Sequence, residues 1–227
     1  MPNQNNIILV MAAYNEEKKI KEVVNDVSRY VDKIIVVDDG SSDNTANAVK
    51  NKKATVIKHR INLGQGAALQ TGFDYAKTLK PQVVITYDAD GQFEPSDIPM
   101  MINPILNGEA DVVLGSRFLG TVENLGLIRR LILKAGVIFT YIFSEIKLTD
   151  THNGFRAMNL KTLNYIHLTQ DRMAHASEII DQIVGCGARY LEVPVTVRYN
   201  DYTKGKKNQS NLNAIKIAFN LIFSRLY

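Results

Sequence analysis

Cysteine is almost absent from this sequence, which contains one residue of this type, Cys186. A single cysteine forms no internal disulfide and cannot build a cluster of thiolates around a metal. The chemistry of the chain therefore fits a reducing compartment, and Cys186 itself is expected to pack as a small apolar side chain.

Long apolar runs and a leader-like N-terminus are also lacking. The apolar residues 7–13 follow an uncharged start and lead at once into charged residues, which is unlike a signal peptide. The most apolar later stretch, residues 131–143, includes Lys134 and is about 13 residues long, whereas a bilayer span needs about 20. We therefore expect no transmembrane helix and a cytoplasmic location.

The excess of positive charge is small. The chain has 27 lysine and arginine residues against 23 aspartate and glutamate residues, a net charge of +4. Proteins that bind nucleic acid typically carry a concentrated run of basic residues, and this chain has none. We expect no nucleic-acid partner, and an anionic small molecule or an anionic membrane surface fits the charge better.

What the sequence does contain is an alternation of short β-branched runs with helical patterns. Strands are predicted at residues 7–11, 33–37, 55–58, 83–87 and 111–114, and helices at residues 18–30, 44–50, 66–79 and 97–106. This alternation predicts an α/β fold with a parallel sheet. With 45% hydrophobic residues among 227, the chain can bury a full core in one domain.

The pattern changes after about residue 120. An amphipathic helix is predicted at residues 125–143, a turn-rich loop at 150–156, a helix at 178–184 and a strand at 190–199. Pro194 within that strand indicates an edge position or a bulge. A polar segment then leads to a second amphipathic helix at residues 212–227.

Acidic side chains follow the predicted strands where each strand ends. Ligands of parallel α/β sheets bind at the carboxyl ends of the strands, so chemistry is expected in these loops. Asp88 and Asp90 directly follow the buried run 83–87, and two aspartates with this spacing can direct both carboxylates to the same mouth of the sheet. Such a pair suits Mg²⁺ or Mn²⁺, with phosphate and water completing the coordination. The four histidines lack metal-ligand spacing and are expected to be solvated or packing residues.

Six motifs, in this order and spacing, resemble the family 2 glycosyltransferases with the GT-A fold, and most closely the dolichol-phosphate and undecaprenyl-phosphate sugar synthases. They are AYNEE (13–17), VVDDGSSDNT (36–45), NLGQGAALQTG (62–72), DADGQ (88–92), GSR (115–117) and GFR (154–156). The resemblance implies a mostly parallel, Rossmann-like sheet flanked by helices. It also implies one catalytic domain at residues 1–211, with a nucleotide-sugar half (1–118) and an acceptor half (119–211), followed by the amphipathic helix 212–227.

The resemblance also implies which residues bind the donor. Tyr14 is expected to lie against the nucleotide base and Asp39 to bind it, while Arg117 offsets diphosphate charge. The expected donor-binding set is Ala13, Tyr14, Glu16, Asp39, Gly64, Asp88, Ala89, Gln92 and Arg117. The expected metal ligands are Asp88, Asp90 and Gln92.

The reaction that the resemblance implies is a metal-dependent single displacement that inverts the anomeric carbon of a GDP-, UDP- or dTDP-linked sugar. The expected catalytic residues are Asp90, Glu178 and Arg117. A hydroxyl acceptor needs a general base, whereas a phosphate acceptor is already anionic. Glu178 is the candidate for a base or an acceptor-positioning group; the alternative is a helix-surface acid paired with a cation.

The acceptor is expected to be lipid-linked, preferably a polyprenyl phosphate, with Arg129, Arg130, Asp150 and Arg156 at its site. A saccharide hydroxyl is the alternative, because residues 202–207 depart from the arginine and Gly-x-Ser-Lys loop of many relatives. A nucleotidylyltransferase has less support, since the N-terminal part has no Gly-rich phosphate loop with lysine. The two amphipathic helices predict peripheral binding to the cytoplasmic face of an anionic membrane.

Overall fold

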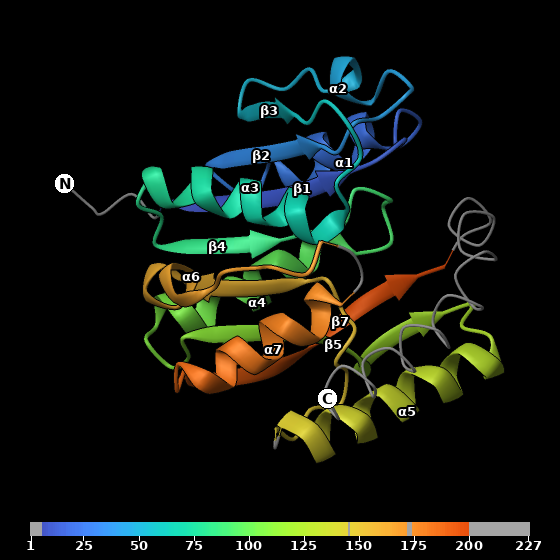
Figure 1. The fold of residues 1–227 in the computed structure, drawn as a ribbon, viewed down its shortest axis with the longest axis vertical. Helices are drawn as coiled ribbons and strands as arrows, with labels where there is room; N and C mark the ends of the chain where they lie inside the picture. The colour runs from blue at the N-terminus through green and yellow to red at the C-terminus, as the bar shows by residue number, and fades with distance from the viewer. Residues whose placement is uncertain (1–5, 145, 172–173, 200–227) are drawn as a thin grey trace.

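Seven strands form one sheet in the computed structural model, which describes residues 6–144, 146–171 and 174–199 (Figure 1). Along the chain they are β1 (Ile7–Ala13), β2 (Lys33–Asp38), β3 (Ala54–Lys58), β4 (Val83–Thr86), β5 (Val112–Glu123), β6 (Arg156–Asn159) and β7 (Tyr190–Arg198). Their order in the sheet is β3-β2-β1-β4-β6-β5-β7. Only β6 runs antiparallel to its neighbours within this sheet, so the mostly parallel arrangement predicted from the sequence is confirmed.

Helices cover both faces of the sheet. They are α1 (Ile20–Val27), α2 (Thr45–Ala48), α3 (Gln65–Thr78), α4 (Ile98–Leu106), α5 (Leu127–Ser144), α6 (Leu160–Tyr165) and α7 (His175–Gly185), with a 3₁₀ turn at Pro95–Asp97. In Figure 1, α3, α6 and α7 lie in front of the sheet and α5 lies apart from it, at the lower right.

The alternation of side chains along β1 explains the two layers. Leu9 and Met11 point into the core shared with α1 and α4, while Ile8 and Val10 point into the core shared with α3 and α7. All four side chains are fully buried. A strand apolar on both faces is stable only between two layers of helices, so β1 lies near the middle of the sheet.

Three elements, β5, β6 and α6, differ from the predictions. The loop predicted at residues 150–156 gives way to β6 at Arg156, which inserts antiparallel between β4 and β5, and α6 follows directly. β5 continues past the predicted end at Leu114 to Glu123, with an irregularity between Ser116 and Thr121 in its pairing to β7. Pro194 lies on β7, an edge strand, as predicted.

The helix α5 occupies the predicted amphipathic segment but leaves much of its apolar surface uncovered. Leu127, Leu131, Ile138 and Tyr141 are 79%, 69%, 61% and 50% exposed. Within the described part of the chain, no helix is long and apolar enough to cross a bilayer. The second amphipathic helix, predicted at residues 212–227, lies outside the described residues.

Candidate active site

The loops after β1 and β2 lie against each other at the carboxyl edge of the sheet. Asp39 donates its backbone N–H to the Ala13 carbonyl at 2.8 Å, and Asn15 donates its N–H to the Ser41 hydroxyl at 2.9 Å. Asn15 has a φ of 55°, in the left-handed region that Asn tolerates better than most residues. Beside this turn Tyr14 is 48% exposed, so its ring is available to a ligand.

The Asp39 carboxylate is buried and holds the entry to α3. It accepts the backbone N–H groups of Leu63 and Gly64 at 2.9 and 2.7 Å, and it lies 2.8 Å from Nδ1 of His59. A Cβ on Gly40 would come within 2.4 Å of the Ile61 carbonyl carbon. The loop after β2 and the loop after β3 therefore touch backbone to backbone. The predicted contact of Asp39 with a base stays a prediction, because both carboxylate oxygens already bind protein donors here.

The loop after β4 carries the candidate metal ligands. Gln92 donates its side-chain amide to the Asp90 carboxylate at 2.6 Å and its backbone N–H at 3.1 Å. Asp88 accepts the Gln65 amide at 3.3 Å, and Gly154 packs so closely that an added Cβ would lie 2.9 Å from the Asp88 carboxylate.

This donor set suits a hard divalent cation. Carboxylate and amide oxygens are ligands that Mg²⁺ and Mn²⁺ accept, and such ions keep positions for phosphate and water. No group of three or more His, Cys, Asp and Glu side chains with metal-binding geometry occurs in residues 6–144, 146–171 and 174–199. Asp88 and Asp90 would therefore bind a cation together with Gln92 and a ligand, and the assignment stays a prediction.

Negative charge is concentrated around this loop. The pKa of Tyr87 is raised well above its usual range, chiefly by burial and further by the charges of Glu94, Asp97, Asp88 and Asp90. Such a field favours a cation at the end of β4.

Arg156 is buried and lines a small cavity together with Asp88, Gln65, Gly154 and His175. Burial lowers the pKa of Arg156 to about 10, although the charges of Asp88 and Asp150 oppose that shift. Arg156 is 3% exposed, and its predicted contact with an acceptor stays a prediction.

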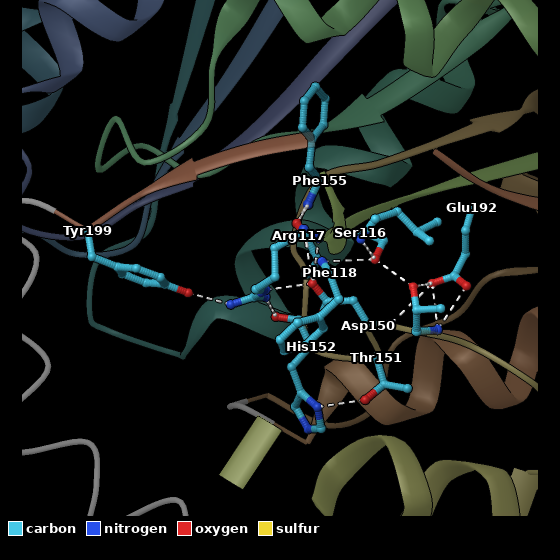
Figure 2. A network of polar contacts seen from close by, with 12 residues as sticks. Ser116, Arg117, Phe118, Asp150, Thr151, His152, Phe155, Glu192 and Tyr199 are labelled. Atoms are coloured by element: carbon cyan, nitrogen blue, oxygen red, sulfur yellow. Dashed lines mark hydrogen bonds and ion pairs between the residues drawn. The ribbon is translucent and has the colours of Figure 1, made fainter. Parts of the chain in front are cut away.

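Arg117 is the centre of a buried polar network (Figure 2). Its Nε donates to Asp150 at 2.5 Å, and its terminal nitrogens donate to the Tyr199 hydroxyl and to the His152 carbonyl at 2.9 Å. Burial alone would lower the pKa of Arg117, but Asp150 and Tyr199 outweigh it and raise that pKa. The side chain predicted to meet the diphosphate is 5% exposed and contacts protein groups, and Asp150 orients it.

Glu192 fixes the loop that presents Asp150. Its carboxylate accepts the Thr149 N–H at 2.8 Å, the Thr149 hydroxyl at 3.0 Å and the Asp150 N–H at 3.2 Å (Figure 2). Asp150 therefore acts on Arg117 from a fixed loop, and the predicted acceptor contact of Asp150 stays a prediction.

The remaining predicted acceptor and catalytic residues lie on helices. Arg130 is exposed on α5, and the side chain of Arg129 is outside the described residues. Glu178 lies in the first turn of α7, where its carboxylate accepts the N–H groups of Thr169 and Gln170. Among the residues that the structure describes, its partners are these backbone donors and the Thr169 hydroxyl, and both interpretations of Glu178 stay predictions.

Several residues of the site were not predicted from the sequence. His59 was expected only to be solvated or to pack, but it bridges Asp39 and the Thr71 hydroxyl. Tyr199 and Glu192 were not singled out, because their partners are 82 and 42 or 43 residues away in the sequence and no local pattern marks such pairs. Gly154 belongs to the GFR motif, and this motif is the feature of the sequence that could have marked Gly154 as a residue of the site.

Comparisons with known proteins agree with this geometry. Residues 8–166 match the model of glycosyl transferase family 2. The chain is 32% identical over 243 residues to the UDP-N-acetylglucosamine–dolichyl-phosphate N-acetylglucosaminyltransferase of Methanococcus voltae, covering 97% of this chain and 96% of that protein. It is 27% identical over 224 residues to the polyprenol monophosphomannose synthase of Mycolicibacterium smegmatis, covering 93% and 84%.

A solved structure has the same fold. The glucosyl-3-phosphoglycerate synthase of Mycobacterium tuberculosis, in complex with Mn²⁺, UDP-glucose and phosphoglyceric acid, matches with a TM-score of 0.67 at 20% identity, covering 87% of this chain and 73% of that one. This likeness confirms the GT-A fold that the sequence motifs imply. Since the family model spans most of the chain and a relative aligns over nearly its whole length, the chain belongs to glycosyl transferase family 2 and the protein is a glycosyltransferase.

Proposed function

We propose that this glycosyltransferase moves a sugar from a nucleotide diphosphate donor to a polyprenyl phosphate, with inversion at the anomeric carbon and with a divalent cation. The observation that carries the proposal is the pair Asp88 and Asp90 at the end of β4, with Gln92 bonded to Asp90, on the same sheet edge as the exposed Tyr14. The full-length similarity to an enzyme named for UDP-N-acetylglucosamine and dolichyl phosphate supports the substrate classes. Membership of family 2 removes the support for a nucleotidylyltransferase.

The chain's own residues account for donor binding. Tyr14 would offer an aromatic face to the base, and we propose that Ala13, Gly64 and Ala89 contact the nucleotide. Asp88, Asp90 and Gln92 would hold Mg²⁺ or Mn²⁺, which when bound supplies Lewis-acid stabilisation of the departing diphosphate. Mn²⁺ accompanies UDP-glucose in the neighbour from Mycobacterium tuberculosis, which supports a divalent cation here.

The chemistry needs little proton transfer when the acceptor is a phosphate. An acceptor oxygen forms the new bond to the anomeric carbon while the bond to the nucleotide diphosphate breaks and its electron pair leaves with the diphosphate. A phosphate oxygen is already anionic, so no general base is required. The saccharide alternative requires a base, and Glu178, the residue proposed for it, already accepts several protein donors.

We further propose that α5 holds the enzyme on the cytoplasmic face of an anionic membrane. Leu127, Leu131, Lys134, Ile138 and Tyr141 share one face of this helix, and we name this set the α5 stripe. Arg130 and Lys134 are exposed there and can meet anionic headgroups. A membrane-bound position would bring the enzyme to a lipid-linked acceptor.

A donor panel tests the reaction. GDP-, UDP- and dTDP-linked sugars are incubated with the full chain, with and without polyprenyl phosphate, and release of nucleotide diphosphate and formation of glycolipid are measured. We expect turnover that needs both polyprenyl phosphate and Mg²⁺ or Mn²⁺. Equal turnover with a saccharide acceptor and no lipid would favour the alternative.

The variant Asp90→Ala tests the metal ligands in the same assay. Turnover should be lost, because the carboxylate would bind the cation, while the unfolding transition should shift by no more than the loss of the bonds from Gln92. The matched control is Asp26→Ala on α1, whose side chain is 44% exposed and pairs at 3.9 Å with Arg29 on the surface. Full activity of Asp90→Ala in the presence of a chelator would contradict the proposed metal dependence.

A further inference from the structure

Glu178 accepts hydrogen bonds with both of its carboxylate oxygens. Oε1 accepts the Thr169 N–H at 2.9 Å and the Thr169 hydroxyl at 2.6 Å, while Oε2 accepts the Gln170 N–H at 3.0 Å. A general base needs a lone pair directed at the acceptor proton, within about 2.6 to 3.2 Å of it. The described partners of the carboxylate are instead the backbone N–H groups of residues 169–170 and the Thr169 hydroxyl.

The molecule contains a second carboxylate with the same arrangement. Glu192 accepts the N–H and the hydroxyl of Thr149 and the N–H of the following residue, Asp150. In that case the carboxylate holds a loop whose aspartate orients Arg117. A glutamate carboxylate that accepts hydrogen bonds from a threonine and from the next backbone N–H thus fixes a second loop, the one beside Arg117.

The loop that Glu178 holds lies along α3. Three bonds join them: Lys77 donates to the Ile166 carbonyl at 3.2 Å, Gln70 accepts the Leu168 N–H at 2.7 Å, and Gly66 donates its N–H to the Asp171 carbonyl at 2.7 Å. A Cβ on Gly66 would lie 2.0 Å from the Gln170 carbonyl oxygen, so no side chain separates the two backbones. Any shift of residues 169–171 is therefore passed to the first turn of α3.

The loops after β2 and β4 also hold that first turn. Gly64 donates its N–H to Asp39, and the Gln65 amide donates to Asp88. The N-terminus of α3 thus lies between Asp39, Asp88 and the loop 169–171. The carboxylates involved are those of Asp39, of Asp88 and, through the loop 169–171, of Glu178.

We infer that Glu178 is a positioning residue, which holds the loop 169–171 against Gly66 and so fixes the N-terminus of α3 relative to Asp88 and Asp39. This inference rests on the proposed function only in naming the nucleotide sugar as the ligand of the site that is fixed. Glu178 takes no proton from the acceptor. Its removal loosens donor binding and leaves the chemistry of the acceptor unchanged.

Three variants test this inference in the full chain. Glu178→Ala removes all the bonds to residues 169–170. Glu178→Gln keeps an oxygen that can accept from Thr169 but cannot act as a base. Glu22→Gln is the matched control, since Glu22 is an exposed acid on α1 that pairs only with Lys19 among the described contacts.

Hydrogen exchange gives a readout that needs neither donor nor acceptor. In Glu178→Ala we expect faster amide exchange in residues 64–70 and 166–171. Glu178→Gln should show a smaller increase, because its amide group leaves one backbone donor without an acceptor, and Glu22→Gln should be indistinguishable from the wild type. Unchanged exchange in Glu178→Ala would overturn the inference. Because this measurement requires no turnover, it stands even if every transfer assay of the wild type fails.

Kinetics then separate positioning from base catalysis. In Glu178→Ala we expect the KM for the nucleotide sugar to rise roughly tenfold, as expected for the loss of hydrogen bonds to a charged group. In Glu178→Gln kcat should stay within about threefold of the wild type with an unchanged pH profile, whereas loss of a base costs roughly 10²- to 10⁴-fold. A fall of that size in Glu178→Gln, with loss of the limb that rises with pH, would overturn the inference.

Discussion

Gly154 leaves almost no room beside Asp88. An added Cβ would lie 2.9 and 3.1 Å from the two carboxylate oxygens, so Gly154→Ala must push the Asp88 side chain aside. We expect activity to fall at least tenfold, because displacing a group of the active site by about 1 Å lowers the reaction rate by a large factor. Assays of turnover and of metal affinity check this.

Gly126→Ala is the control for that substitution. Nothing lies within 4 Å of the Cβ that it adds, and this residue precedes α5 on the surface. Its activity should match the wild type. Equal activity of both variants would show that Asp88 needs no fixed position.

Asp39 offers a second prediction at the residue scale. In Asp39→Asn the amide group must face one of the two backbone donors, Leu63 or Gly64, and so leaves it without an acceptor. We expect the free energy of unfolding to fall by about 1 to 3 kcal/mol and nucleotide affinity to fall with it. Urea unfolding and calorimetry with UDP and GDP measure the two effects. Unfolding at the wild-type urea concentration would show that the loop is held by other contacts.

The site could be predicted from the sequence where its residues are close together in the chain. Asp88, Asp90 and Gln92 belong to one loop, and their spacing after a buried strand indicates hard-cation chemistry. The pairing of His59 with Asp39 could not be predicted, because it depends on Gly40 letting two loops touch. Burial likewise decides what Arg117 and Arg156 contact, and composition does not show burial.

At the scale of elements, Asp111 joins three strands at the base of the sheet. Asp111 lies just before β5, and Arg189 lies just before β7. The Asp111 carboxylate accepts hydrogen bonds from the backbone N–H and the Nε of Arg189 and from the side-chain amide of Asn159 on β6, each at 3.0 Å. The bonds from Arg189 lower the pKa of Asp111 to about 2. A carboxylate with a lowered pKa stabilises the fold above its unfolded pKa, near 4, and this contribution is lost as the pH falls towards 2.

The variant Asp111→Asn should therefore be less stable than the wild type at pH 7 by up to about 1 kcal/mol, the range of an exposed ion pair. The difference should narrow as the pH falls from about 4 to 2, because the wild-type carboxylate then becomes neutral. Chemical unfolding at several pH values measures it. A difference that is constant with pH would show that the charge of Asp111 contributes nothing.

The first half of the fold follows from periodicity, and the second half does so less well. The strands β1 to β4 are runs of β-branched residues separated by helical patterns, and each lies within a few residues of its predicted position. β6 has four residues, begins with an arginine and carries a strand signal too short to distinguish from a loop. It is a strand because β4 and β5 offer it two partners, which is information about tertiary structure.

For the whole molecule, the α5 stripe predicts reversible binding to membranes. Replacing Leu127, Leu131 and Ile138 together by Ser removes three exposed apolar side chains, each worth about 1.5 to 3 kcal/mol when fully buried. We expect binding to anionic liposomes to fall by about 100-fold or more, measured by co-sedimentation. Wild-type binding should grow with anionic lipid content and fall with salt.

Two further variants complete that experiment. Val184→Ser removes an exposed apolar residue of α7 outside the stripe and should bind like the wild type. Removal of residues 212–227, which lie outside the described residues, tests the second amphipathic helix predicted from the sequence. Failure of the full chain to sediment with any lipid mixture would favour a soluble saccharide acceptor.

The antiparallel insertion of β6 has a consequence for the order in which the chain folds during synthesis. β4 is complete at Thr86, but the strand that covers its free side begins at Arg156. At typical rates of translation, the roughly 70 residues between them take on the order of 4 to 14 s to emerge, so β4 spends that time as an open edge on the nascent chain. An uncovered edge strand is a template for pairing with other chains. Ribosome-bound chains that end before β6 are thus expected to pair with other chains more readily than the complete protein does.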